Sequence, residues 1–367
     1  MLLSSITTTF DDGRRRVSAD VDGAPLWFES ADAALSPSPE GFASAMLIPA
    51  IARGETLTLE DSLSATWLSN INRILQVFRE WWGYPEAAPQ PASVRSAAAT
   101  RLESTALCFS GGVDSFYTLL RSGYTINYLV FVIGFDMGLG DVARAAEFES
   151  SLREVAAEAG ARPVIVRSNI REHPVFASVS WEYTHGGAMA AVGHLLGDAA
   201  GQLLISSSRT RDDHTPWGSH WMTDELWSSE RLSVIHVGAE LNRRQKLALI
   251  AAEPIVRRRL RVCWENRAPA GNCSRCEKCV RTRLALLDCG VLADFTVFEG
   301  EETLARHIDD LPPSRGKLAT HRKLANQDNI SAEIKQALSR LIERTDRANS
   351  PRQNIFQRIW SRRRLWT

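Results

Sequence analysis

The stretch TALCFSGGVDSF, residues 105–116, gives the clearest structural signal in the chain. A short apolar run ends abruptly at Ser110-Gly111-Gly112, and Asp114 and Ser115 then open a segment of helical character. Two consecutive glycines permit positive φ and let backbone N–H groups converge on one point at a helix N-terminus. The stretch therefore predicts a strand, a glycine-rich loop and a helix in immediate succession.

The same loop predicts an anion-binding site. Unpaired amides and the positive end of a helix dipole both attract an anion at this position. The hydroxyls of Ser110 and Ser115 add donors, and Asp114 fits a phosphate site when a Mg²⁺ ion stands between the two anions. A metal-bound polyphosphate accounts for all six residues, Ser110, Gly111, Gly112, Val113, Asp114 and Ser115. The alternative is a simple Gly-Gly turn capped by Asp114.

The chain around this loop predicts the α/β class, with a doubly wound parallel sheet. Continuous apolar strands that alternate with helices are typical of a parallel sheet covered on both faces. In such sheets ligands bind at the carboxyl ends of the strands. We expect strands over 105–109, 126–135, 163–168 and 202–206, and helices over 114–122, 142–159 and 184–197.

Composition shifts predict the domain organisation. Residues 1–83 suggest a small α+β module, in which helical spacing over 62–82 follows a cap at Asp61 or Ser62. Residues 84–103 are rich in Pro, Ala and Ser and suggest a linker. We expect the α/β domain over 104–300 and a helical extension over 301–367, with a helix around 331–348.

Charge and hydropathy exclude some functional classes. Forty-three basic residues balance forty-three acidic ones in 367 residues, so no overall field favours nucleic acid or an anionic membrane. The longest apolar stretch, residues 126–135, is too short to span a bilayer. We expect a cytoplasmic protein without membrane or nucleic-acid partners. A homodimer, or a protein partner bound through residues 1–83, is compatible with the sequence.

Four of the six cysteines lie in one window, RVCWENRAPAGNCSRCEKCVRTR, residues 261–283. Cys263, Cys273, Cys276 and Cys279 have the spacing Cys-x9-Cys-x2-Cys-x2-Cys, which allows four thiolates to form a tetrahedron around Zn²⁺. Four protein ligands leave no open position, so such a zinc is structural. An iron–sulfur cluster or four free buried thiols are the alternatives.

The SGGVDS loop resembles the PP-loop of the ATP pyrophosphatase superfamily. Combined with the later four-cysteine window, residues 104–290 resemble the 7-cyano-7-deazaguanine synthase (QueC) family. The resemblance implies cleavage of ATP to AMP and pyrophosphate, adenylation of 7-carboxy-7-deazaguanine, and transfer of the acyl group to ammonia to give an amide and then a nitrile. It also implies that the zinc is structural.

Individual residues carry over by position. Residues 110–115 would hold the ATP phosphates and Mg²⁺, and Glu240 and Lys246 stand where the family has an acid and a lysine ahead of the zinc segment. Arg281 and Arg283 match the family's basic residues after the last cysteine. The resemblance makes Asp114 and Lys246 catalytic candidates and Glu240 a candidate for substrate contact.

Three segments depart from the family pattern: GFDMGLGD at 134–141, EYTHGGAM at 182–189 and TPWGSHWMTDELWSS at 215–229. They stand where the family shapes its substrate pocket, so the chain resembles a paralogue. Such paralogues occur in bacterial antiphage operons, where the resemblance suggests that a deazaguanine carboxylate is coupled to a protein amine. A nucleotide-binding scaffold without catalysis is the alternative, and tRNA sulfur transfer is disfavoured because no cysteine lies on an expected active-site loop.

The loop over 209–227 is the expected substrate region, because it leaves the carboxyl end of a strand. Arg209 could stabilise an adenylated acid as a third catalytic candidate, Trp217 could stack on a heterocycle, and His220 and Asp224 could bind its edge. The alternative is a loop with buried tryptophans and solvated charges.

Two further groups are candidates near the expected site. His185, with Gly186 and Gly187, could form a second anion-binding turn or a simple helix start. Asp136 and Asp141 could border the nucleotide, since both follow the second expected strand.

Overall fold

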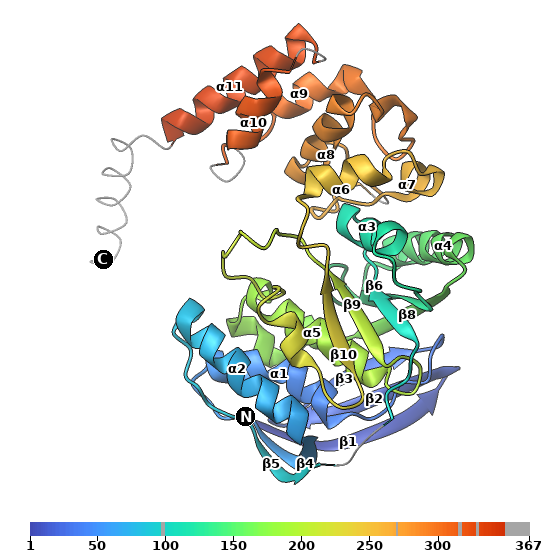
Figure 1. The fold of residues 1–367 in the computed structure, drawn as a ribbon, viewed down its shortest axis with the longest axis vertical. Helices are drawn as coiled ribbons and strands as arrows, with labels where there is room; N and C mark the ends of the chain where they lie inside the picture. The colour runs from blue at the N-terminus through green and yellow to red at the C-terminus, as the bar shows by residue number, and fades with distance from the viewer. Residues whose placement is uncertain (97–99, 269–270, 315–317, 328–329, 349–367) are drawn as a thin grey trace. The chain divides into compact units, whose positions relative to one another are not determined.

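The computed structural model describes residues 1–367 except 97–99, 269–270, 315–317, 328–329 and 349–367 (Figure 1). The chain divides into two compact units, Met1–Lys246 and Leu247–Thr367. The first unit has the expected α/β class, with a mostly parallel sheet. The division falls far from residue 100, where the sequence suggested a boundary between an N-terminal module and the α/β domain.

Ten strands form one sheet in the order β10-β9-β6-β7-β8-β3-β2-β1-β4-β5. They are β1 (Leu2–Asp11), β2 (Arg14–Val21), β3 (Ala24–Ser30), β4 (Thr58–Ser64), β5 (Gln90–Arg95), β6 (Thr105–Cys108), β7 (Tyr128–Ile133), β8 (Arg162–Ser168), β9 (Gln202–Ser206) and β10 (Ser233–Val237). The α-helices of the first unit are α1 (Pro39–Ala52), α2 (Ala65–Trp82), α3 (Val113–Arg121), α4 (Val142–Ala159) and α5 (Trp181–Leu195), and α6 (Arg243–Ile250) begins in it. Its 3₁₀ turns are η1 (Ile170–Glu172), η2 (Pro174–Ser178) and η3 (Asp224–Trp227).

The five parallel strands β6–β10 place the glycine-rich loop at the topological switch point of the sheet. β6 pairs with β7 on one side and with β9 on the other, and both pairs are parallel. The chain therefore runs outward through β7 and β8 before it returns to the far side of β6 through β9 and β10. Open α/β sheets bind ligands beside such a reversal, outside the carboxyl ends of the strands. The SGGVDS loop follows β6 at this position.

The N-terminal strands belong to the same sheet rather than to a separate module. Phe28 and Glu29 of β3 pair antiparallel with Ser168 and Arg167 of β8. One hydrophobic core runs from Leu3 through the helices to the parallel strands. The expected linker also contributes β5, which pairs in parallel with β4. The independent 1–83 module and the plain linker over 84–103 were therefore wrong for the described residues.

Alternate residues of the parallel strands pack into two layers. Val130, Val132 and Ile205 belong to the core that α1, α2 and α5 share. On the opposite face, Phe131 of β7 packs against Phe148 of α4, with ring centroids 3.9 Å apart. Figure 1 shows α3 and α4 on the side of the sheet opposite to α1, α2 and α5. Both faces are covered, as the continuous apolar strands predicted.

Two N-terminal helices differ from the sequence prediction. α1 was not predicted, because almost every residue from Glu40 to Ile51 is buried and no polar face reveals a helical period. α2 was predicted with a cap at Asp61 or Ser62, but its cap is Ser64, whose hydroxyl accepts a hydrogen bond from the Trp67 N–H at 3.0 Å. Residues 58–64 pair as β4, so the helix begins later than the apolar spacing suggested.

The second unit is helical. It contains the rest of α6, then α7 (Pro254–Arg259), α8 (Glu277–Asp288), η4 (Leu292–Asp294), η5 (Glu301–Thr303), α9 (Leu304–Asp309), α10 (Leu318–Ala325) and α11 (Ala332–Ala348). Val280 and Leu284 of α8 share a core with Leu304 of α9 and Leu338 of α11. The cysteine segment and the C-terminal extension therefore form one unit, and not two regions divided at residue 300. The end of the expected extension, residues 349–367, lies outside the described residues.

Candidate functional site

The SGGVDS loop turns sharply between β6 and α3. Gly111 has φ 70°, a left-handed conformation that glycine adopts without a steric penalty, and Gly112 is the N-cap of α3. The amide of Phe116 donates to the Gly112 carbonyl at 3.0 Å and makes the first helical bond. Within this fully described helix no side chain caps the N-terminus, so the amides of its first turn face outward without an intrahelical acceptor. This arrangement suits an anion.

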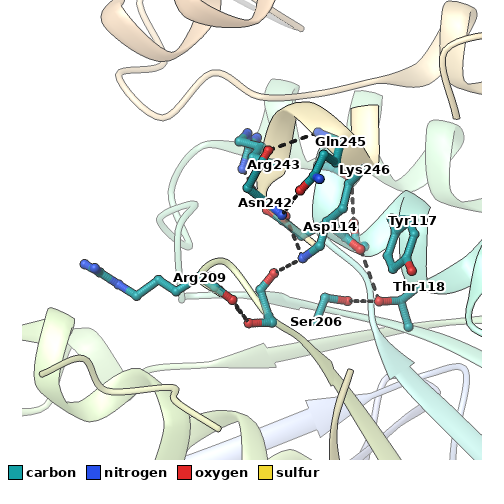
Figure 2. A network of polar contacts seen from close by, with 12 residues as sticks. Asp114, Tyr117, Thr118, Ser206, Arg209, Asn242, Arg243, Gln245 and Lys246 are labelled. Carbon is teal, nitrogen blue, oxygen red and sulfur yellow. Dashed lines mark hydrogen bonds and ion pairs between the residues drawn. The ribbon is translucent and has the colours of Figure 1, made fainter. Parts of the chain in front are cut away.

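Asp114 lies in the first turn of α3 and contacts two cations. Arg243 Nη1 donates to its Oδ2 at 2.7 Å, and Lys246 Nζ lies 3.3 Å from its Oδ1 (Figure 2). Both cations come from the start of α6, three residues apart and therefore on one helix face. The structure thus brings two separately predicted catalytic candidates, Asp114 and Lys246, together beside the glycine-rich loop. Sequence reasoning missed Arg243, although its spacing from Lys246 was a usable signal.

Lys246 is the more deeply placed of the two cations. Its side chain is 1% exposed, and Nζ also donates to the Ser207 carbonyl at 2.5 Å. Burial lowers the pKa of Lys246, and the neighbouring Asp114 carboxylate opposes that effect. Gly238 leaves room for the lysine, because a Cβ there would lie 3.3 Å from Nζ. The ammonium group is therefore held at the carboxyl end of β9 between the strand and α3.

Glu240 and Tyr117 flank this pair. The Tyr117 hydroxyl donates to Glu240 Oε1 at 2.8 Å, and Lys246 Nζ lies 5.6 Å from the centre of the tyrosine ring. Burial and the hydrogen bond to Glu240 raise the pKa of Tyr117. Glu240, predicted as a substrate contact, is thus linked through Tyr117 to the cluster formed by Asp114, Arg243 and Lys246.

The two serines of the loop differ in their surroundings. Ser110 is exposed, and the Gly112 amide lies 3.4 Å from its hydroxyl oxygen. Ser115 is buried, and its hydroxyl donates back to the Gly112 carbonyl at 3.1 Å. The Ser110 hydroxyl is therefore accessible to a ligand at the loop, whereas the Ser115 hydroxyl stabilises the turn.

Arg209 does not join this cluster. Its guanidinium donates to Asp213 Oδ2 at 2.7 Å and lies over the Trp217 ring, 5.0 Å from the centroid. Figure 2 shows its side chain pointing away from Asp114. The backbone of Arg209 is nevertheless tied to the site, because the Ser207 hydroxyl donates to its carbonyl at 2.5 Å. Arg209 and Trp217 belong together on the loop that follows β9.

Two predicted substrate contacts, His220 and Asp224, are engaged within the protein. His220 uses both ring nitrogens, since Nε2 bonds the Asp213 carbonyl at 3.1 Å and Nδ1 accepts from the Met222 amide at 3.2 Å. Asp224 is fully buried and bonds Nδ1 of His236 at 2.7 Å. Neither side chain offers a free edge to a ligand. Their position on the loop was predicted from sequence, but their internal partners were not.

The remaining candidates lie in different places: the His185 group is within α5, Asp141 is at the start of α4, and Asp136 is exposed. His185, Gly186 and Gly187 lie inside α5, whose N-cap is Ser180, so these residues form neither a second anion-binding turn nor the start of a helix. The glycines allow close packing, because a Cβ on Gly186 would lie 2.0 Å from a carbonyl oxygen of the 218 loop. Asp141 is the N-cap of α4 and pairs with Arg144 at 2.6 Å.

The four cysteines of the second unit cluster as a candidate metal site. Their ligand atoms all lie within 4.8 Å of one another, and all four residues are buried. Cys263 Sγ and Cys276 Sγ are 3.9 Å apart, close to the roughly 3.8 Å expected for two sulfurs at tetrahedral positions 2.3 Å from a zinc ion. The Cys276 amide points to Cys273 Sγ at 3.3 Å, which orients a thiolate ligand. The donor set therefore fits a metal ion with tetrahedral sulfur coordination.

Buried Arg283 supports this segment from α8. Its guanidinium donates to the Ser274 carbonyl at 2.8 Å, between two of the cysteines, and to His307 Nδ1 at 3.0 Å. It also bonds the Gly300 carbonyl and Thr303 Oγ1. The predicted basic residue after the last cysteine thus holds three chain segments of the unit together.

Comparisons with known proteins add no further identification. No protein-family model, no curated protein and no solved structure matches the chain. Among the described residues, no helix has both the length and the apolar character that crossing a bilayer requires. The fold and site therefore define an α/β protein with an anion-suited loop at the switch point of its sheet, together with a second unit that carries a four-cysteine site.

Proposed function

We propose that this protein uses ATP to adenylate a carboxylate, releasing pyrophosphate, and then transfers the acyl group to ammonia or another amine. The resemblance of the SGGVDS loop and the cysteine window to the QueC-like PP-loop proteins suggests 7-carboxy-7-deazaguanine or a related deazapurine as the acid. The proposal covers a protein amine as the acceptor.

One observation carries the proposal: an uncapped helix N-terminus, an acidic side chain and two cations meet at the switch point of the sheet. Asp114 lies in the first turn of α3, and Arg243 and Lys246 both reach it from α6. A plain capped turn would need neither cation. A polyphosphate would need both, because amides and ammonium or guanidinium groups together neutralise its charge.

The chain's own residues can then be given roles. The loop amides and the Ser110 hydroxyl would hold the departing pyrophosphate. Lys246, fixed against the Ser207 carbonyl, would stabilise charge that develops on the transferred phosphate. Asp114 would give up its contacts with the two cations and hold Mg²⁺, which supplies charge neutralisation on the polyphosphate when bound. Arg243, released from Asp114, would turn toward the phosphates.

The bond changes balance without an additional reactant. The carboxylate oxygen bonds to the α-phosphorus of ATP as the bond to pyrophosphate breaks. The amine then attacks the acyl carbon and loses a proton to solvent, and AMP leaves with its phosphorus–oxygen bonds intact. The four-cysteine site would hold zinc in a structural role, because four thiolates leave no position for substrate.

The test is to incubate the protein with ATP, Mg²⁺ and 7-carboxy-7-deazaguanine, with and without ammonia, and to measure AMP and the modified base by mass spectrometry. We expect AMP from the wild type and from a control variant, Asp61→Ala, on a strand outside the site. The Asp114→Ala variant should lose at least a hundredfold in rate, in line with removal of one stabilising group from a charged transition state.

Other outcomes separate the alternatives. ADP in place of AMP contradicts the proposed chemistry. ATP binding that depends on Asp114, without AMP from any carboxylic acid, would favour a nucleotide-binding scaffold. AMP that forms only after a partner protein is added would identify a protein amine as the acceptor.

A further inference from the structure

A buried carboxylate organises a second polar centre, on the face of the sheet that α5 covers. Asp224 is fully buried and accepts three hydrogen bonds: from the Ser219 hydroxyl at 2.7 Å, from the His220 amide at 3.0 Å and from His236 Nδ1 at 2.7 Å. Three donors satisfy the ionised carboxylate. Because Asp224 accepts, the Nδ1 of His236 carries the proton.

In the neutral ring with its proton on Nδ1, the other nitrogen of His236 is a hydrogen-bond acceptor. The side chain is only 3% exposed, and its one hydrogen bond among the described residues uses Nδ1. Nε2 is not one of the fully enclosed, unpartnered polar atoms of the described chain, so it retains contact with solvent. The ring is thus nearly buried, and its second nitrogen has no hydrogen-bond partner within the described part of the protein.

His185 repeats the pattern on α5. Its Nδ1 bonds the Trp181 carbonyl at 3.1 Å, so Nε2 is again the acceptor nitrogen, and it is likewise not enclosed. Burial lowers the pKa of His185 and favours its neutral form, although the Asp224 charge acts in the opposite direction. Asp224 is thus near both imidazoles. The proposed mechanism uses neither ring.

His185 lies against Trp217, and His236 lies near the carboxyl end of β10. The Trp217 ring centroid is 5.6 Å from that of His185, in an edge-to-face arrangement. His236 is the penultimate residue of β10 and is in register with Ile205, whose side chain belongs to the core shared with α5. Val237, one residue further, accepts from the Ser207 amide at 2.8 Å, and the Ser207 carbonyl accepts from Lys246.

We propose that His185 and His236 accept hydrogen bonds from the N–H groups of a planar heterocyclic substrate that packs against Trp217. The inference rests on the proposed function, because it assigns the residues that recognise the base whose carboxylate is adenylated. A guanine-like ring suits the site, since its six-membered ring carries adjacent N–H donors. Two neutral imidazole acceptors would discriminate against rings that present acceptors at the same edge.

The test measures binding of 7-carboxy-7-deazaguanine by calorimetry at about pH 8, where an imidazole of ordinary pKa about 6.5 is neutral. His236→Asn keeps an N–H donor for Asp224 but removes Nε2, and should weaken binding roughly tenfold, the effect of one lost hydrogen bond. His236→Gln can place an amide oxygen near the position of Nε2 and should recover part of the affinity. The matched control is His214→Asn, on the loop that carries Trp217, where the histidine is exposed.

Binding of ATP, measured separately, should be unchanged in all these variants. His185→Asn provides an independent test and should also weaken base binding while ATP binding persists. The inference is overturned if the wild type does not bind the base, or if both Asn variants bind it as tightly as the control. Base binding that depends on the histidines, without AMP formation, would refute the proposed function and leave this site standing.

Discussion

Replacing Arg283 by methionine should destabilise the second unit by about 3 kcal/mol. The arginine side chain is fully buried and donates to two backbone carbonyls, a hydroxyl and an imidazole, at Ser274, Gly300, Thr303 and His307. Methionine fills a similar volume but donates nothing, so four buried acceptors lose their partner. Each acceptor left without a donor lowers the free energy of unfolding by about 1 kcal/mol, because part of its hydration is regained.

One effect works in the opposite direction. Arg283 Nε is buried without a hydrogen-bond partner, and burial lowers the pKa of the guanidinium, so the native charge is already partly destabilised. Removing that buried charge therefore raises the free energy of unfolding by about 1 kcal/mol. The net loss of about 3 kcal/mol is roughly a 150-fold change in the unfolding equilibrium.

The assay is urea unfolding followed by circular dichroism, with retained metal measured on the same samples. The control is Arg347→Met, which removes an exposed pair with Glu343 and should change stability by less than about 0.5 kcal/mol. Equal stability of the Arg283→Met variant and the control would refute the reasoning, because it would mean that the buried acceptors lose nothing. Loss of metal at lower urea concentration in the Arg283 variant would show that the three held segments support the cysteine site.

Three further predictions concern other parts of the chain. Burial opposes ionisation of Glu230, but hydrogen bonds at the N-terminus of α2 lower its pKa to about 2. The ionised carboxylate should therefore contribute fully to stability above about pH 5, and this contribution should be lost as the pH falls toward 2. The melting temperature of Glu230→Gln should accordingly converge with that of the wild type in acid. Cys276→Ser should bind less metal and melt at a lower temperature, whereas elemental analysis of the wild type should give one zinc per chain, and iron would contradict a zinc site. Gly186→Ala should cost more than about 1 kcal/mol in urea unfolding because its Cβ would meet a carbonyl oxygen at 2.0 Å, whereas Gly138→Ala, with open space around it, should cost little.

Local features of the site were predictable because they depend on residues close together in sequence. The strand, loop and helix around Gly111 follow from apolar spacing and from two glycines, and the structure contains all three. The four cysteines cluster because short Cys-x2-Cys turns bring most of the thiols together. Lys246 was a candidate from a family resemblance alone, and its contact with Asp114, 132 residues away in sequence, was not predicted.

The partners of single polar groups were not predictable in the same way. His220 and Asp224 have side chains suited to a ligand, but tertiary packing supplies them with partners inside the protein. Arg209, expected to stabilise an adenylated acid, pairs with Asp213 and points away from Asp114. A sequence shows which groups can form hydrogen bonds, whereas the choice among competing partners depends on which atoms the fold brings within 3 Å.

The sequence by itself determined the α/β class, the strand-loop-helix around Ser110–Ser115 and the positions of four thiols, because each depends on local periodicity or spacing. Tertiary structure alone decided that the N-terminal strands join the sheet through β3 and β8, and that Arg243 and Lys246 meet Asp114. It also decided that His236 bonds Asp224. These contacts join residues far apart in sequence, and strand pairing and burial in the folded chain select them.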